Sequence, residues 1–139
     1  MYTKFGQFID GKWQAAEKNE TYEVINPATE EIIGNASKAS KIDVEKALKS
    51  AEKGLEKWKK TTPWERSYKI RKIADLMREK KDVLAKWLTL EVGKPIAEGI
   101  GETMSSADIF EWNSEETKRI YGQTVESRFE NTRVHVYYQ

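Results

Sequence analysis

The sequence predicts a mostly helical α+β fold, with β-hairpins at its N-terminal end and a strand at its C-terminal end. Three observations predict this fold. The dipeptide Asp10-Gly11 separates two short β-rich runs, and capping residues precede several runs with helical spacing of apolar residues. The run 133–138 alternates and is β-branched and aromatic. We expect a β-hairpin arm over 1–39, a helical region over 40–122 and a β arm over 123–139.

The N-terminal arm is expected to contain two β elements. Asp10-Gly11 supplies the positive φ of a tight hairpin turn between residues 7–9 and 12–13. A second β-rich run, 21–25, is followed by a turn at 26–29 and by the apolar pair Ile32-Ile33. Small ribbons of this kind rarely stand alone, so we expect a helix or a neighbouring chain to cover one face.

The first helix is expected over about 41–60. Ser40 offers an N-cap hydroxyl, and Asp43 can reach back to the free amides, as in a capping box. The apolar residues then share one helical stripe: Val44, Leu48, Ala51, Leu55 and Trp58. Lysines and glutamates fill the other face, which indicates one core face and one solvated face.

Two further helices are expected over about 63–79 and 82–92. Thr62 is the predicted cap, Pro63 occupies the first helical position, and Glu65 is placed to close the capping box. The lysine-rich interval 80–82 has no apolar member, which favours a break between the two helices. Gly93 is the expected left-handed cap, and Pro95 blocks continuation.

A fourth helix is expected over about 96–121, with Gly122 placed to end it. The strand that follows, 133–138, needs a partner edge. All the other predicted strands lie in the distant N-terminal arm. We therefore expect this strand to pair with something outside the chain.

Composition excludes several classes of function. The chain has 139 residues, 38% of them hydrophobic and 34% charged, with a formal net charge of +1, so no strong field gathers nucleic acid or anionic lipid. The start, 1–6, lacks the layout of a secretory signal, and no apolar window is long enough to span a membrane, so we expect a cytoplasmic protein. Zero cysteines exclude disulfides, thiolate metal sites and a cysteine nucleophile, and one histidine leaves little for a metal site.

Two glycine motifs have weak nucleotide-binding interpretations. Gly99-Ile100-Gly101 begins like a dinucleotide fingerprint, but the third glycine is missing and the segment follows a helix break instead of a strand. Gly93-Lys94 is similar to the end of a phosphate loop, yet Pro95 replaces the magnesium-binding hydroxyl. A helix cap explains Gly93 better.

Three further groups of residues are candidates for a site. Asp108, Glu111 and Glu115 share a helical face that could gather a hard cation, although solvated carboxylates are commoner there. His135 is isolated and is better explained as a surface or interface residue. The stripe positions of the large aromatic side chains favour core packing or a protein interface over stacking on nucleic acid: Trp58, Trp87 and Phe110. We therefore expect no catalytic, cofactor-binding or metal-binding residue in this chain.

Four segments, taken in order, resemble the amino-terminal part of the aldehyde dehydrogenase superfamily. They are Phe8-Ile9-Asp10-Gly11-Lys12-Trp13, Ile25-Asn26-Pro27-Ala28-Thr29-Glu30-Glu31, Glu91-Val92-Gly93-Lys94-Pro95, and the run from Trp112 to Gly122. The last is similar to the version in succinate-semialdehyde dehydrogenases. Three positions depart from the family pattern: Glu30 stands where a glycine is usual, and Ser114 and Thr117 where alanines are common.

The resemblance implies an α/β enzyme that oxidises an aldehyde with NAD or NADP through a cysteine thiohemiacetal, of which this chain is the N-terminal part, inactive alone. It implies that residues 40–122 are the helical region of the cofactor domain and that this N-terminal part wraps around that domain. It also implies that the sequence stops before the cofactor-binding strand. It also implies that 125–138 serves subunit association in a homo-oligomer. The expected partner is the remainder of the enzyme, in the same longer chain or in a second polypeptide.

The alternative is a non-catalytic helical module for protein interaction or oligomerisation. The two hypotheses differ in the surface that they require. An enzyme segment should leave a large apolar surface bare, whereas an autonomous module should not.

Overall fold

The computed structural model describes residues 6–138, which form four α-helices, one 3₁₀ turn and three two-stranded antiparallel hairpins. Residues 1–5 and Gln139 lie outside the described residues. The expectation that the chain begins without a secretory signal concerns residues 1–6, so most of that segment is not described. The elements follow the chain in this order: β1 (Gln7–Ile9), β2 (Lys12–Gln14), β3 (Thr21–Ile25), β4 (Ile32–Ser37), α1 (Lys41–Trp58), α2 (Pro63–Glu79), α3 (Lys81–Val92), α4 (Ile96–Glu116), η1 (Thr117–Arg119), β5 (Gln123–Glu126) and β6 (Arg133–Val136).

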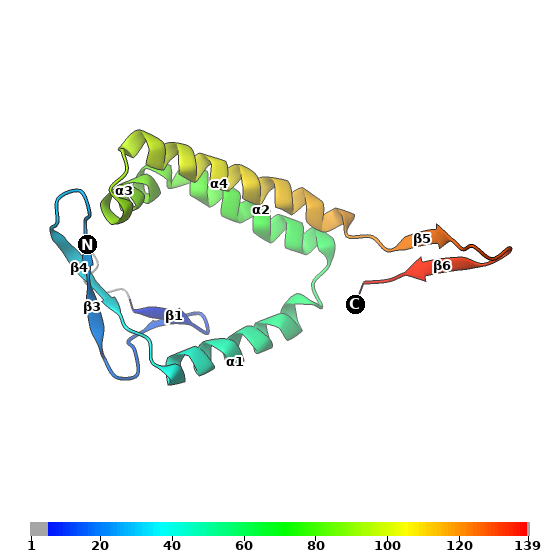
Figure 1. Cartoon of the computed structure of the whole chain (residues 1–139), viewed down its shortest axis with the longest axis horizontal. Helices are drawn as coiled ribbons and strands as arrows, with labels where there is room; N and C mark the ends of the chain where they lie inside the picture. Colours follow the sequence, from blue (N-terminus) through cyan, green and yellow to red (C-terminus); the bar gives the residue numbers. More distant parts are fainter. Residues whose placement is uncertain (1–5, 139) are drawn as a thin grey trace.

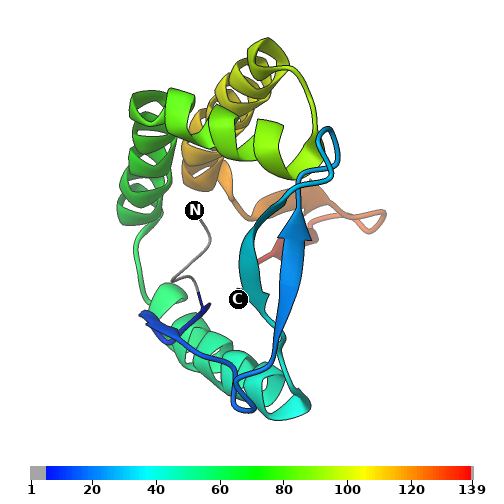
Figure 2. The same cartoon turned by 90° about the vertical axis from the view of Figure 1, so that its left-hand side faces the viewer.

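The elements are arranged as an open ring (Figure 1). Helices α2 and α4 lie side by side along one side of the ring, with α3 packed on α4 at one end. Helix α1 forms the opposite side, and the β3–β4 hairpin extends between α1 and the α3 end of the ring (Figure 2). The β1–β2 hairpin lies beside α1. The β5–β6 hairpin projects away from the ring.

The two predicted N-terminal hairpins are present. Asp10 and Gly11 have φ of 53° and 75°, and they bring Phe8 and Trp13 opposite each other with ring centroids 5.2 Å apart. In the turn between β3 and β4, the side chain of Asn26 accepts a hydrogen bond from the amide of Ala28 at 2.9 Å. The predicted turn chemistry is therefore confirmed.

Asp43 joins the N-terminal arm to α1. Its carboxylate accepts hydrogen bonds from the amide and hydroxyl of Ser40, at 2.8 and 2.9 Å, which confirms the predicted capping box. The same carboxylate accepts from the amide of Glu17, at 3.1 and 3.2 Å. Asp43 is buried beside Ala16, so this carboxylate fixes the loop after β2 on the start of α1.

The ends of the helices follow the predicted signals with small differences. Helix α1 ends at Trp58 and not near residue 60, because Arg66 binds the carbonyls of Trp58 and Lys59 at 3.1 and 3.3 Å. The break between α2 and α3 falls at Lys80, with φ −101° and ψ 16°. Gly93 caps α3 with a φ of 76°, as predicted.

One detail of the second cap was predicted wrongly. The hydroxyl of Thr62 accepts from the amide of Glu65 at 3.2 Å, as expected for an N-cap. The Glu65 side chain, expected to reach back to Thr62, instead pairs with Lys69 at 2.7 Å. An i,i+4 ion pair on the exposed helix surface competes successfully with the reciprocal half of the capping box.

The packing of α2, α3 and α4 rests on small side chains. The apolar residues that become fully buried between these helices are alanines: Ala74, Ala85 and Ala107. A Cβ on Gly99 would lie 2.9 Å from the carbonyl oxygen of Ala85, so glycine allows α3 and α4 to approach closely. No helix within residues 6–138 is both long and apolar enough to cross a membrane.

The fourth helix was predicted too long. It ends at Glu116 and tightens into η1, whereas the prediction carried it to about residue 121. Hydroxyl groups take the last carbonyls of the helix: Ser114 donates to Glu111 at 2.6 Å, and Thr117 donates to Ser114 at 2.7 Å. Gly122 does not cap the helix, since a Cβ there would lie 2.3 Å from the carbonyl oxygen of Val136.

The prediction that the C-terminal strand lacks a partner in the chain was wrong. Strand β6 pairs with β5, with Val125 opposite Val134 and Thr124 opposite His135. Strand β5 is short, and its sequence, Gln-Thr-Val-Glu, has no strong strand pattern. Strand β6 also ends at Val136, before the predicted limit of residue 138.

Replacing Glu30 with glycine should stabilise the protein. Glu30 has a φ of 59°, a conformation that costs an L residue about 1–2 kcal/mol. Glycine removes this cost but loses more entropy on folding, so we expect Glu30→Gly to raise the free energy of unfolding by up to about 1 kcal/mol. Urea titration measures the change. Glu23→Gly, in the extended strand β3, should lower stability, and a gain there would contradict the explanation.

The Asp43 junction should make stability depend on pH. The hydrogen bond from the Ser40 amide, above all, holds the pKa of Asp43 below its ordinary value. Because the pKa is lower in the folded state, the stabilisation is complete above the unfolded pKa of about 4 and is lost as pH falls through the folded value. Asp43→Asn should lower the melting temperature at neutral pH and flatten its fall in acid, and Ser40→Ala should cost about 1 kcal/mol. Asp82→Asn, at an exposed acid on α3, is the control and should change neither.

Candidate functional site

The Gly99-Ile100-Gly101 segment is not a nucleotide-binding turn. Both glycines lie inside α4, and Gly99 packs against Ala85 of α3. A dinucleotide fingerprint needs a loop that leads from a strand into a helix N-terminus, so that free amides face the pyrophosphate. A helix-packing role therefore explains Gly99, while a Cβ added at Gly101 would meet no atom within 4 Å. Neither glycine lies in the loop that the nucleotide interpretation requires.

The Gly93-Lys94-Pro95 segment is a helix cap and a contact point. The amide of Gly93 donates to the carbonyl of Thr89 at 2.9 Å, and a Cβ on Gly93 would lie 3.0 Å from Cγ of Pro27. Lys94 pairs with Glu102 of α4. The loop is thus held against the β3–β4 turn, and its lysine is already engaged.

The predicted carboxylate face of α4 exists, but its acids are paired. Arg78 of α2 donates to Asp108 at 2.7 Å and to Glu111 at 2.5 Å. Glu115 pairs with Lys118 at 2.7 Å. The hydrogen bond that Arg78 donates to Asp108, followed by the one that it donates to Glu111, raises the pKa of Arg78. The hydrogen bond from Lys118 lowers the pKa of Glu115.

These ion pairs spread the carboxylates instead of gathering them. Among the described residues, no group of three or more acidic or histidine side chains is placed to hold a metal ion. Arg71 also reaches Glu111 at 3.0 Å, so the network ties α2 to α4. The arrangement holds the two helices together through ion pairs.

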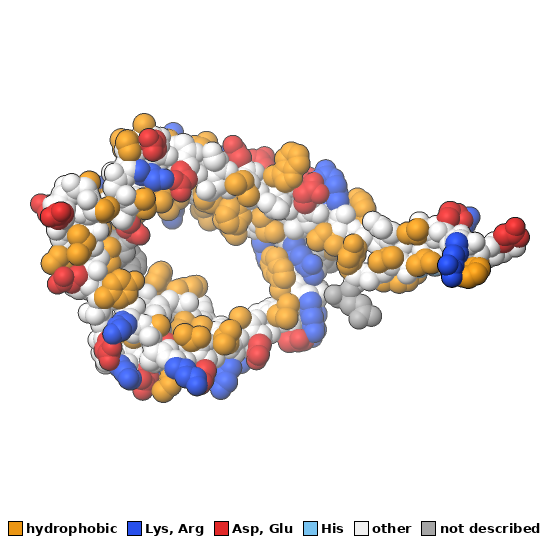
Figure 3. Space-filling model, viewed as in Figure 1, with side chains coloured by type: hydrophobic (Ala, Val, Ile, Leu, Met, Phe, Trp, Pro, Cys, Tyr) orange, Lys and Arg blue, Asp and Glu red, His pale blue; other side chains and the backbone are white. Residues whose placement is uncertain are grey.

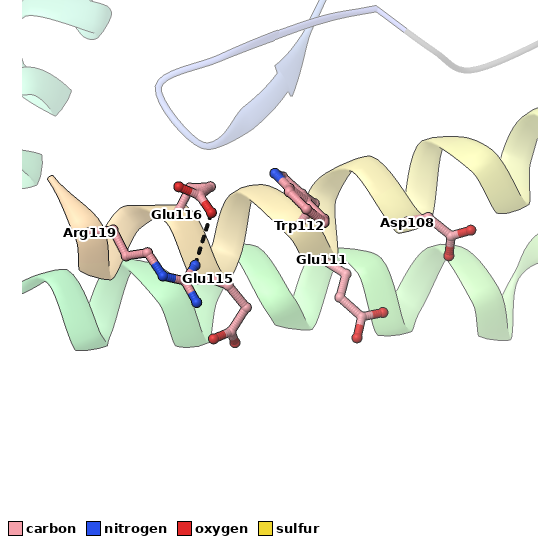
Figure 4. A pocket seen from close by; sticks show the side chains of 6 residues that line it. All are labelled: Asp108, Glu111, Trp112, Glu115, Glu116 and Arg119. Carbon is pink, nitrogen blue, oxygen red and sulfur yellow. Dashed lines mark hydrogen bonds and ion pairs between the residues drawn. The ribbon is translucent and has the colours of Figure 1, made fainter.

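A shallow groove of about 580 Å³ runs along this face of α4 (Figure 4). Six residues line it: Asp108, Glu111, Trp112, Glu115, Glu116 and Arg119. Glu116 and Arg119 pair at 2.9 Å, and the Trp112 side chain is 71% exposed. The groove offers a bare aromatic ring among neutralised charges, which suits contact with another protein surface better than chemistry on a small molecule.

The remaining candidates, His135 and the aromatic side chains of the helices, contact neighbouring side chains or are partly exposed. His135 lies across the β5–β6 hairpin from Thr124, with 3.1 Å between Nδ1 and Oγ1, and its ring stacks on Tyr137. The Trp58 ring lies near the guanidinium of Arg66 and the ammonium of Lys69, at 5.8 and 6.0 Å. Trp58 and Phe110 are each 39% exposed, so interface positions describe them better than core positions.

The structure leaves a large apolar surface bare, as the enzyme-segment hypothesis requires. The accessible surface is 11026 Å², whereas a compact monomer of 16.1 kDa exposes about 7,400 Å². The α1 stripe, predicted as core, is open: Leu48 and Leu55 are each 60% exposed. Apolar side chains line much of the inner rim of the ring (Figure 3). The apolar residues of α1 do lie on one stripe, as predicted, but their spacing does not show which element covers that stripe.

Comparison with known proteins gives one family. The sequence model of the aldehyde dehydrogenase family matches residues 13–139. The chain is 44% identical over 118 residues to glutarate-semialdehyde dehydrogenase of Pseudomonas aeruginosa, which covers 85% of this chain and 24% of the relative. It is 39% identical over 117 residues to the NADP(+) succinate-semialdehyde dehydrogenase of Escherichia coli. This match covers 84% of this chain and 24% of the relative.

Solved structures agree with the sequence matches. An NADP-dependent enzyme of E. coli superposes with a TM-score of 0.89 at 35% identity, over 96% of this chain and 28% of that one. Betaine aldehyde dehydrogenase of Staphylococcus aureus, solved with NAD+, superposes with a TM-score of 0.86 at 28% identity, over 94% and 27%. The chain therefore spans about a quarter of the length of the relatives it matches.

Proposed function

Because the chain belongs to the aldehyde dehydrogenase family, we propose that it works as the N-terminal segment of an NAD(P)-dependent enzyme that oxidises an aldehyde to a carboxylate. The observation that carries the proposal is the open ring with its apolar inner rim. Apolar surface of this extent is not stable in water, so another part of the enzyme is expected to fill the ring. This chain covers only about a quarter of each relative, which also supports the remainder of the enzyme as its partner.

We propose a short-chain semialdehyde as the substrate. Several relatives that match this region are named for glutarate semialdehyde or succinate semialdehyde, and one is named for 3-sulfolactaldehyde. The proposal rests on likeness across the whole segment and not on a recognition residue.

We propose that the reactive groups lie outside this chain. The sequence has no cysteine, so it supplies no thiol to attack an aldehyde. NAD or NADP would supply the hydride acceptor in the complete enzyme. The residues of this chain support that chemistry through packing: 40–122 as the helical region of the cofactor domain, 1–39 as a strand arm and 123–139 as a β arm.

The alternative, an autonomous interaction module, requires a covered apolar surface. Among the described residues, the buried apolar side chains are all alanines: Ala16, Ala74, Ala85 and Ala107. A module that functions alone would bury its Leu, Ile and Trp side chains. The enzyme-segment proposal explains their exposure, and the module proposal does not.

The activity proposal is tested by a chimera. Residues 13–139 replace the matching quarter of the P. aeruginosa relative, and formation of NADH or NADPH is followed with glutarate and succinate semialdehydes. We expect the chimera to be active and the chain alone to be inactive. The matched variant Leu48→Glu/Leu55→Glu places two charges on the α1 stripe and should abolish assembly of the chimera. Activity of the pure chain, or an inactive chimera of native size, would contradict the proposal.

We also propose a homo-oligomer formed through the β5–β6 hairpin. Because side chains alternate across a strand, three valines share one face of the hairpin: Val125, Val134 and Val136. The opposite face carries polar residues, among them Thr124 and His135. An exposed two-stranded hairpin with one apolar face gains stability when that face is covered.

Charge on the valine face should separate the subunits. We expect Val125→Lys/Val134→Lys to shift the chain toward monomer in sedimentation at micromolar concentration. The control, Thr124→Lys/His135→Lys, adds the same charges to the polar face and should leave the association unchanged. A wild-type chain that sediments as a monodisperse monomer would refute the oligomer.

A further inference from the structure

We propose that a groove beside α1 binds a small molecule carrying phosphate groups. The groove has a volume of about 480 Å³ and lies between the second half of α1 and the turn of the β1–β2 hairpin. Lys53, Lys57 and Lys60 contribute three ammonium groups to its lining. This site is distinct from the apolar inner rim, and the proposal does not depend on the proposed dehydrogenase function.

The three lysines belong to a longer row on one side of α1. Spacings of three and four residues place five lysines within one stripe of the helix: Lys46, Lys49, Lys53, Lys57 and Lys60. This stripe lies opposite the apolar stripe that contains Leu48 and Leu55. Lysine side chains are visible along the edge of the molecule over α1 (Figure 3). The helix therefore presents its apolar side and its cationic side in opposite directions.

The groove lysines are uncompensated. Within residues 6–138, no carboxylate forms an ion pair with Lys53, Lys57 or Lys60, although Lys59, next to this row, pairs with Glu56 at 2.6 Å. Like charges at i and i+4, as in Lys53 and Lys57, destabilise a helix by a few tenths of a kcal/mol. A bound anion would reduce the repulsion between these ammonium groups, which favours anion binding in the groove.

The floor of the groove is open. Ser50 and Gly54 lie one turn apart on α1, and a Cβ added at Gly54 would meet no atom within 4 Å. Glycine inside a helix costs about 1 kcal/mol relative to alanine, so Gly54 is not explained by helix stability. It leaves open space beside Lys57, at the edge of the lysine row, while the Ser50 hydroxyl can donate to an anion oxygen.

The charge of the lining favours an anion with several negative groups. Asp10 and Glu56 are the acidic members, and Glu56 is already neutralised by Lys59, so the three ammonium groups prevail. Lysine binds phosphate as a point charge, and the volume is that of a small-molecule site. A net charge of +1 for the whole chain argues against a nucleic acid as the occupant.

Calorimetric titration of the full chain with pyrophosphate tests the proposal. We expect saturable binding that weakens as salt is added, because the attraction is electrostatic. Lys53→Gln/Lys57→Gln should weaken binding about tenfold or more, whereas Lys46→Gln/Lys49→Gln, on the same row outside the groove, should leave it nearly unchanged. Gly54→Leu fills the floor without changing charge and improves helix propensity, so it should abolish binding in a folded chain.

Several outcomes would overturn the proposal. They are no saturable heat at millimolar pyrophosphate, an equal loss in both lysine pairs, or unchanged binding in Gly54→Leu. Citrate and a short duplex DNA serve as competing anions. Binding of citrate as tight as that of pyrophosphate would replace phosphate with general polyanion recognition, and tighter binding of DNA would replace the small molecule with a nucleic acid.

Discussion

The close contact of α2, α3 and α4 through small side chains is the constraint on which the rest of the structure depends. Ala74, Ala85 and Ala107 are fully buried, and Gly99 allows α3 to approach α4. Such a contact brings helix backbones together but buries little apolar area per residue. The large apolar side chains are therefore left for other surfaces, and the ring stays open around an apolar inner rim.

Polar joints hold the parts of the ring where apolar packing is thin. The carboxylate of Asp43 fixes the N-terminal arm to α1, and Arg66 fixes the end of α1 to the start of α2. Between α2 and α4, Arg71 and Arg78 reach across to the acids of α4. These contacts orient elements without filling the ring, which is the behaviour expected of a segment that surrounds another part of a larger protein.

The candidate sites acquire structural roles in the folded chain. Gly99, which looks like part of a nucleotide fingerprint, packs α4 on α3, and Gly93, which looks like part of a phosphate loop, caps α3. The acids that could hold a cation pair with arginine and lysine side chains. Each motif supplies the correct residue types but not the backbone geometry that the chemistry needs. The family relationship therefore rests on the match along the whole segment, and the proposed activity on groups outside it.

The sequence by itself determined the local elements and the family resemblance. Caps at Ser40 and Thr62, the turn at Asp10-Gly11 and the stop at Gly93 could be predicted because each depends on a few neighbouring residues. Only the tertiary structure decided the pairing of β5 with β6, the early end of α4 and the exposure of the α1 stripe. These features depend on contacts between distant residues, such as Gly122 with Val136, and on what covers an apolar face. Local periodicity marks such a face without stating what will be packed against it.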